Sequence, residues 1–194
     1  MNKDFVLEIY KKPQTIFSLK EISLLFPELT YKNLKSKLSY FVSVGKLKRV
    51  RKGIYAKENF NPLELANKIY TPSYISLETV LEKEGIVFQK YKTIFVSSYL
   101  TRRIKVGDQE IFYRKIKDEV LLNSLGVREE ENSFFIASKE RAFLDAVFIY
   151  KDYHFDNLRP LDWEKIREIE KIYSNKALVK RVTQYYKIYR QDNA

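Results

Sequence analysis

Apolar residues in the first third of the chain recur at helical spacing in three stretches. The first covers residues 5–10. The second follows Ser18, which can cap a helix start, and Glu21 three positions later completes a capping box. The third runs from Thr30 to Gly45, since threonine can cap the first turn and glycine readily takes the left-handed conformation that ends a helix. We expect residues 16–17 to form a brief extended piece between the first two helices.

The third of these helices has an apolar face and a polar face. Its apolar face contains four residues at helical spacing, Leu34, Leu38, Phe41 and Val42. The opposite face carries Tyr31, Lys32, Lys35, Ser36 and Ser39, with Asn33 and Lys37 flanking it. An ordinary surface helix can have the same lysine-rich face, so the helix alone does not decide its role.

The segment after Gly45 predicts two short strands around a tight turn at residues 51–53. Five of its residues are basic, namely Lys46, Lys48, Arg49, Arg51 and Lys52. A polar and basic helix followed by a basic hairpin is typical of a winged helix-turn-helix, in which the helix enters the DNA major groove and the hairpin contacts the flanking backbone. The sequence therefore predicts a DNA-binding domain over residues 1–58.

The candidate contacts divide into base-reading and backbone-binding residues. The early turns of a recognition helix lie deepest in the groove, so the base-reading candidates are Tyr31, Lys32, Asn33, Lys35 and Ser36. Asn33 can pair with adenine and Lys32 or Lys35 with guanine, although Asn33 can equally solvate the helix start. Lys37 is expected to contact a phosphate or only water. The five basic hairpin residues are the phosphate-binding candidates, which predicts an affinity that falls steeply with salt.

The distribution of charge supports a polyanionic partner for this region. Residues 1–60 hold 13 basic and 5 acidic residues, which is +8 of the formal net charge of +11. The chain has no cysteine and one histidine, His154, which excludes disulfides, thiolate catalysis and a histidine-rich metal site. No apolar run is long enough for a membrane span. We expect a cytoplasmic protein with no metal and no cofactor.

The rest of the chain predicts a mixed α/β domain over residues 59–194, so the fold class is α+β. We expect a helix starting at Asn61-Pro62, a second through Tyr74 to Gly85, and a short antiparallel sheet. The sheet comprises candidate strands at residues 93–96 and 134–136 and a hairpin at residues 104–115 around Gly107-Asp108. Residues 139–150 are almost wholly apolar on every side, which indicates a buried helix. Further helices are expected after a cap at Asp162.

Three features of this second part can carry chemistry. Arg102, Arg103 and Lys105 form a candidate second basic surface, which can extend the DNA surface, contact an acidic partner or simply be solvated. Asp145 lies within the apolar helix and needs a partner if buried, for which an arginine is the expectation. Asp108, Glu110 and Lys115 lie close together on the predicted hairpin, but their spacing does not suit a metal-dependent nuclease. We assign no catalytic residue.

Three sequence motifs, in this order along the chain, resemble the AbiEi antitoxin family of type IV toxin–antitoxin systems. They are the basic hairpin at residues 45–56, Leu65-Ala66 with residues 72–78 and Gly85-Ile86, and residues 137–145. Together they span roughly residues 15–150. The family usually has proline where this chain has Ser138. The resemblance implies a winged helix that represses its own operon and a C-terminal domain that counteracts a nucleotidyltransferase toxin.

The leading hypothesis is therefore a repressor of double-stranded operator DNA that also acts as an antitoxin and is not an enzyme. A type IV antitoxin opposes its toxin without a tight complex, so direct contact with the toxin is not assumed. The alternative is a stand-alone winged-helix regulator whose second domain senses a ligand or dimerises. A third hypothesis is an enzyme acting on nucleic acid. A neighbouring nucleotidyltransferase gene would distinguish the first hypothesis from the second.

Overall fold

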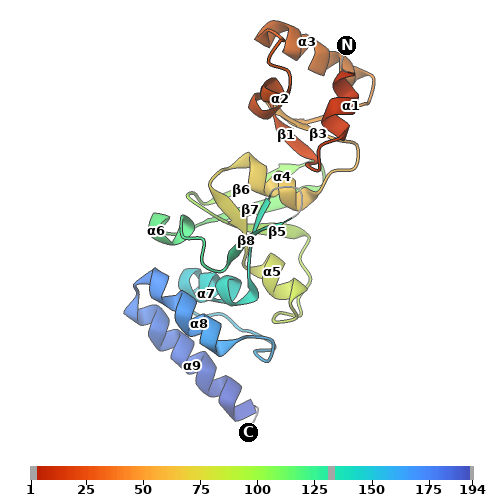
Figure 1. Ribbon diagram of the computed structural model, residues 1–194. Coiled ribbons are helices and arrows are strands. Elements are labelled where there is room, and N and C mark those ends of the chain that lie inside the picture. Colours follow the sequence, from red (N-terminus) through yellow and green to blue (C-terminus); the bar gives the residue numbers. More distant parts are fainter. Residues whose placement is uncertain (1–3, 131–133, 193–194) are drawn as a thin grey trace. The chain divides into compact units, whose positions relative to one another are not determined.

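The computed structural model describes residues 4–130 and 134–192, which form an α+β protein with two β-sheets (Figure 1). Within these residues the chain forms nine α-helices, one 3-10 helix and nine strands. The described residues divide into two compact units. One comprises residues 4–69 with Phe134, and the other comprises residues 70–130 and 135–192.

The first unit contains the three helices and the hairpin that the sequence predicts. Its elements, in chain order, are α1 (Phe5–Tyr10), β1 (Ile16–Ser18), α2 (Leu19–Leu25), α3 (Tyr31–Ser43), β2 (Lys48–Arg51), β3 (Ile54–Ala56) and α4 (Pro62–Ile69). The predicted extended piece at residues 16–17 is confirmed as part of β1, which pairs with β3. The resulting antiparallel sheet has the order β1-β3-β2.

Polar side chains fix the starts of α2 and α3 as predicted. Ser18 Oγ accepts a hydrogen bond from the Glu21 amide at 3.2 Å, and a Glu21 carboxylate oxygen accepts from the Ser18 amide at 2.8 Å, so the capping box is confirmed. Thr30 Oγ1 accepts from the Asn33 amide at 3.3 Å. Gly45, with a φ of +73°, lies just beyond α3 in the left-handed conformation.

An apolar core joins the three helices to the small sheet. The two central residues of the α3 apolar face, Leu34 and Leu38, are fully buried. Around them pack Phe5, Ile9, Phe17, Ile22, Phe26, Leu47 and Tyr55. Burial of these side chains is the main source of stability for a unit this small. It also fixes the opposite face of α3 toward solvent.

A buried carboxylate attaches α4 to this unit. Glu64 is fully buried, and its oxygens accept hydrogen bonds from the amides of Thr15 and Ile16 at 2.9–3.1 Å and from the Thr15 hydroxyl at 2.6 Å. Lys68 Nζ also lies 2.6 Å from a Glu21 oxygen. These contacts explain why the first compact unit ends at Ile69, later than the boundary expected after residue 58.

The second unit is built on a six-stranded sheet with the order β6-β7-β5-β4-β9-β8. Its elements are β4 (Ser73–Ile75), α5 (Glu78–Lys83), β5 (Thr93–Ser98), β6 (Arg102–Val106), β7 (Gln109–Lys115), α6 (Asp118–Leu121), β8 (Val127–Glu130), β9 (Phe134–Ala137), α7 (Lys139–Ile149), α8 (Trp163–Ile169), the 3-10 helix η1 (Glu170–Tyr173) and α9 (Lys176–Asp192). The sheet is mixed, because β5 pairs with β7 and β4 with β9 in parallel. The expectation of a short antiparallel sheet was therefore wrong.

The structure also corrects the helix expected through Tyr74. Residues Ser73–Ile75 form β4, which pairs with β5 and β9 in the interior of the sheet, and the helix begins only at Glu78. All three β4 residues are buried. A short apolar run of this kind does not reveal by periodicity whether it is a buried strand or a buried helix. The short elements α6 and β8 are not predicted from the sequence.

Other predictions for the second unit are confirmed. The β6–β7 hairpin turns at Gly107, which has a φ of +60°, and pairs antiparallel over its whole length. Residues 140–147 of α7 are all buried. Asp162 caps α8 through hydrogen bonds from the amides of Glu164 and Lys165. Helices α8 and α9 both pack on α7 (Figure 1).

Candidate nucleic-acid interface

Helix α3 presents the predicted base-reading residues to solvent. All six residues proposed on this helix, from Tyr31 to Lys37 with Leu34 excepted, are exposed. Leu34 and Leu38 anchor the helix from the other side, so the exposed face cannot turn inward without loss of the core. The arrangement leaves a helix face that is free to enter a groove.

The lysines of α3 do not all point the same way. Lys35 Nζ lies 4.3 Å from the centroid of the Tyr31 ring, and Lys37 Nζ lies 5.9 Å from that of Phe5 in α1. Both distances suit a weak cation–π attraction at an exposed site. Lys37 is thus directed toward α1, which separates it from the base-reading candidates.

Tyr40 joins this face, although the sequence reading did not select it. It lies four residues after Ser36, on the same side of α3, and is 60% exposed. The signal was present in the sequence as an aromatic residue on the polar face. An exposed aromatic residue there can make apolar contact with a thymine methyl group or with a sugar.

The five basic residues of the hairpin region are also exposed. Lys48 Nζ donates to the Glu58 carbonyl at 2.9 Å, and the Tyr10 hydroxyl donates to the Lys46 carbonyl at 3.0 Å, which ties α1 to the start of the hairpin. The pairing of β2 with β3 shifts register between Arg49 and Arg51, which is a β-bulge. A bulge increases the local twist and changes the direction of the side chains beside it.

The segment that contains α3 and the hairpin has no acidic residue. Residues 29–57 hold nine basic and no acidic residues. Because α3 and the hairpin both lie within this segment, their positive charges are not neutralised by carboxylates of the segment itself. Such a region attracts a polyanion over a range set by the Debye length, about 8–10 Å at physiological ionic strength.

Lys57, which is half-buried, also binds backbone carbonyls and has a structural role. Its ammonium donates to the backbone carbonyls of Tyr10 and Lys12 at the end of α1. A cation at the C-terminus of a helix is favourable because it complements the orphan carbonyls there. Partial burial lowers the pKa of Lys57, and the nearby Glu64 carboxylate opposes that shift.

The structure separates the three residues of the candidate second basic surface. Arg103 and Lys105 share one face of β6, whereas Arg102 points to the other face, because alternate residues of a strand face opposite ways. Arg102 donates to the Tyr70 hydroxyl at 3.0 Å. Arg103 lies 3.8 Å from a Glu110 oxygen and 4.2 Å from the centroid of the Phe112 ring. Only two of the three therefore form a common surface.

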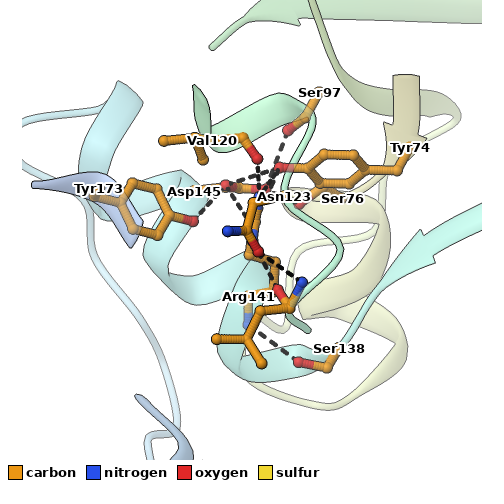
Figure 2. A network of polar contacts seen from close by, with 10 residues as sticks. Tyr74, Ser76, Ser97, Val120, Asn123, Ser138, Arg141, Asp145 and Tyr173 are labelled. Atoms are coloured by element: carbon orange, nitrogen blue, oxygen red, sulfur yellow. Dashed lines mark hydrogen bonds and ion pairs between the residues drawn. The ribbon is translucent and has the colours of Figure 1, made fainter. Parts of the chain in front are cut away.

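The expected internal partner of Asp145 is confirmed as Arg141 (Figure 2). Asp145 accepts hydrogen bonds from four hydroxyl groups, those of Tyr74, Ser76, Ser97 and Tyr173. Arg141 donates to the carbonyls of Val120 and Leu125 and to the Tyr74 hydroxyl. Burial alone would lower the pKa of Arg141, but Tyr173, Tyr74 and Asp145 outweigh it and raise the pKa. Both charged side chains are thus bound by several groups of the protein interior, which suits a structural role.

Other candidate chemistry does not assemble into a site. Across residues 4–130 and 134–192, no group of three or more His, Asp or Glu side chains is arranged to hold a metal ion. Asp108 lies in the hairpin turn, and Glu110 contacts Thr93 and Arg103. His154 lies in a loop, as expected, with its ring 3.7 Å from Asp156. None of the helices in the described part of the chain is long and apolar enough to cross a membrane.

Comparison with known proteins leaves the interface to be judged on its geometry. No protein-family model matches the chain, and no curated protein matches it at a significant level.

Proposed function

We propose that the first unit binds duplex DNA as a winged helix-turn-helix and that the protein represses its own operon as the antitoxin of a type IV toxin–antitoxin system. In this proposal α3 enters the major groove, and the β2–β3 hairpin lies along the flanking backbone. Lys32, Asn33 and Ser36 contact base edges, while Arg49 and Arg51 contact phosphates.

One observation carries the DNA-binding part of the proposal. All eleven residues expected to contact DNA are exposed. They all lie within residues 29–57, a segment that has no acidic residue. The apolar core beneath α3 and the pairing of β3 with both β1 and β2 place the helix and the hairpin in a single compact unit. Two exposed basic elements within one compact unit support binding to one duplex through both elements.

The antitoxin part of the proposal is supported by the order of the three sequence motifs that resemble the AbiEi family. The first motif coincides with the hairpin region, and the third motif runs from the end of β9 into α7. The partner toxin in this proposal is a nucleotidyltransferase encoded beside the gene. The protein itself performs no catalysis and needs no cofactor.

Binding to the DNA upstream of the gene tests the repressor function. Fluorescence anisotropy with that duplex and with a scrambled duplex of equal length should show preference for the natural sequence. Asn33→Ala should lower the preference by about 1–3 kcal/mol, because it removes a base contact. Equal affinity of the protein for both duplexes would contradict a sequence-specific repressor.

Growth rescue tests the antitoxin function separately. Co-expression with the neighbouring toxin should restore growth, and the double variant Arg49→Ala with Arg51→Ala should still restore it although its operator binding is weaker. Loss of rescue with intact operator binding in this variant would contradict the proposed division between the two units. Operator binding without any rescue would favour the alternative, a stand-alone winged-helix regulator.

A further inference from the structure

The β6–β7 hairpin and the residues that follow it concentrate positive charge in the second unit. Residues 102–117 hold six basic and two acidic residues, a net charge of +4. Residues 61–194 as a whole hold 23 basic and 20 acidic residues, a net charge of only +3. Because β6 is an edge strand of the six-stranded sheet, this charge lies at one margin of the unit.

Cations and aromatic rings alternate along one face of this margin. The Phe112 ring centroid lies 4.2 Å from the Arg103 guanidinium and 5.1 Å from that of Arg114. The Arg114 guanidinium also lies 4.5 Å from the centroid of the Tyr150 ring. We name these four residues, Arg103, Phe112, Arg114 and Tyr150, the stacked strip.

Backbone pairing and a hydrogen bond hold the stacked strip in place. Arg103 is the cross-strand partner of Phe112, and Arg114 follows Phe112 on the same face of β7. The Tyr150 hydroxyl donates to Glu78 Oε2 at 3.2 Å, and the Tyr150 ring stacks on Tyr153 with centroids 5.3 Å apart. The strip is therefore ordered before any ligand binds.

The stacked strip keeps most of its positive charge. In the part of the chain that the structure describes, no carboxylate oxygen lies within 4.0 Å of the Arg114 side chain. Arg103 has Glu110 at 3.8 Å, but both side chains are about half exposed, and such a pair contributes little. Lys105, on the same face of β6 as Arg103, adds a further exposed charge.

We propose that the stacked strip binds single-stranded nucleic acid. Unpaired bases stack on guanidinium planes and aromatic rings, while Arg and Lys side chains contact the phosphates between them. The base faces of a duplex are covered by neighbouring bases. A duplex can therefore be attracted by the positive charge of this margin, but its bases cannot stack on the guanidinium groups and aromatic rings. An acidic protein segment can likewise use only the charge. The strip provides both features in alternation, which favours a single strand.

Exchange of arginine for lysine tests this proposal without removing charge. The probe is a fluorescein-labelled, unstructured oligouridine, and its binding to the full chain is measured by anisotropy. The double variant Arg103→Lys with Arg114→Lys should bind about tenfold more weakly, because lysine has no plane on which a base can stack. The dependence of affinity on salt should stay unchanged, because every charge remains. The matched control is Arg159→Lys with Arg190→Lys in the same unit, which should bind like the unchanged protein.

Three outcomes would overturn the proposal. Equal affinity of the Arg103→Lys, Arg114→Lys variant and the control would show that the strip only stabilises the sheet. An equally large loss of affinity for a duplex of the same length in the Arg103→Lys, Arg114→Lys variant would assign the margin to duplex DNA. Displacement of oligouridine by polyglutamate at an equal concentration of charge would assign it to an acidic protein. Fluorescence of Trp163, the only tryptophan, verifies that each variant keeps the second unit folded.

Discussion

Arg141 Nε and Asp145 Oδ1 lie 3.5 Å apart on successive turns of α7, and neither side chain has any exposure to solvent (Figure 2). An isolated charge at such a position is very unfavourable, so each residue depends on the other. The exchange Asp145→Asn keeps the shape of the side chain but leaves the Arg141 charge without its counter-ion. We expect it to destabilise the second unit by about 3–5 kcal/mol.

Chemical denaturation followed by Trp163 fluorescence measures this effect. Trp163 belongs to α8 and its ring packs on Phe143 of α7 with centroids 5.9 Å apart, so its fluorescence reports the packing around the ion pair. Glu168→Gln, an exposed carboxylate on α8, is the control and should change the free energy of unfolding by less than about 0.5 kcal/mol. A similar small change for Asp145→Asn would refute the structural role of the pair.

The buried Glu64 carboxylate predicts a second effect, in the first unit. Glu64→Gln removes the negative charge and replaces one acceptor oxygen with a donor that faces the amides of Thr15 and Ile16. Hydrogen bonds to charged groups contribute about 1.5–3 kcal/mol each, so we expect at least that loss of stability. Native-state hydrogen exchange should show faster exchange of the two amides, and unchanged rates would disprove their dependence on Glu64.

The hydrogen bonds of Ser138 predict that proline does not suit this position. Its φ of −66° would allow proline, but its amide donates to the Gly126 carbonyl at 2.7 Å and its hydroxyl accepts from the Arg141 amide at 3.2 Å. Ser138→Ala loses only the cap and should cost about 1 kcal/mol. Ser138→Pro loses both bonds and should cost more than Ser138→Ala in thermal unfolding. A proline variant more stable than the alanine variant would contradict this account.

Glu21 predicts a dependence of stability on pH. Burial alone would raise its pKa, but the Lys68 ammonium and the Ser18 amide and hydroxyl outweigh burial, and the pKa falls below its ordinary value of 4.5. A carboxyl with a lowered pKa in the folded state stabilises that state above its unfolded pKa, and the contribution disappears as the pH falls through the folded pKa. The first unit should therefore lose this contribution below about pH 4.5.

Glutamine at position 21 isolates this contribution, because it preserves the capping box but does not titrate. The difference in unfolding free energy between the natural chain and Glu21→Gln should shrink as the pH falls below 4.5. Glu28→Gln, an exposed carboxylate of the same unit, is the control. A difference that stays constant with pH would exclude a role for the Glu21 charge.

Local signals in the sequence predicted the first unit better than the second. Ser18, Thr30 and Gly45 mark helix ends through side chains and backbone preferences that act within a few residues, so the pattern alone fixes them. The pairing of Asp145 with an arginine was also predictable from nearby residues, because Arg141 lies one helical turn away.

Long-range pairing was not predictable from the same signals. The strand at Tyr74 has neighbours on both sides that come from distant parts of the chain, and its apolar residues show no period that distinguishes it from a helix. Glu64 has partners 48 and 49 residues away in sequence, so its burial could not be foreseen. The stacked strip depends on the register of β6 with β7, which places Arg103 beside Phe112.

The salt dependence of DNA affinity tests the central claim most directly, that α3 and the hairpin contact one duplex together. The logarithm of the association constant is measured against the logarithm of salt concentration for the natural chain, for Arg49→Ala with Arg51→Ala, and for Lys12→Ala with Lys20→Ala. We expect the hairpin variant to lower the steepness by about two, one for each lost phosphate contact, and the second variant, which removes two charges outside residues 29–57, to leave it unchanged. Equal slopes for all three proteins would contradict the claim.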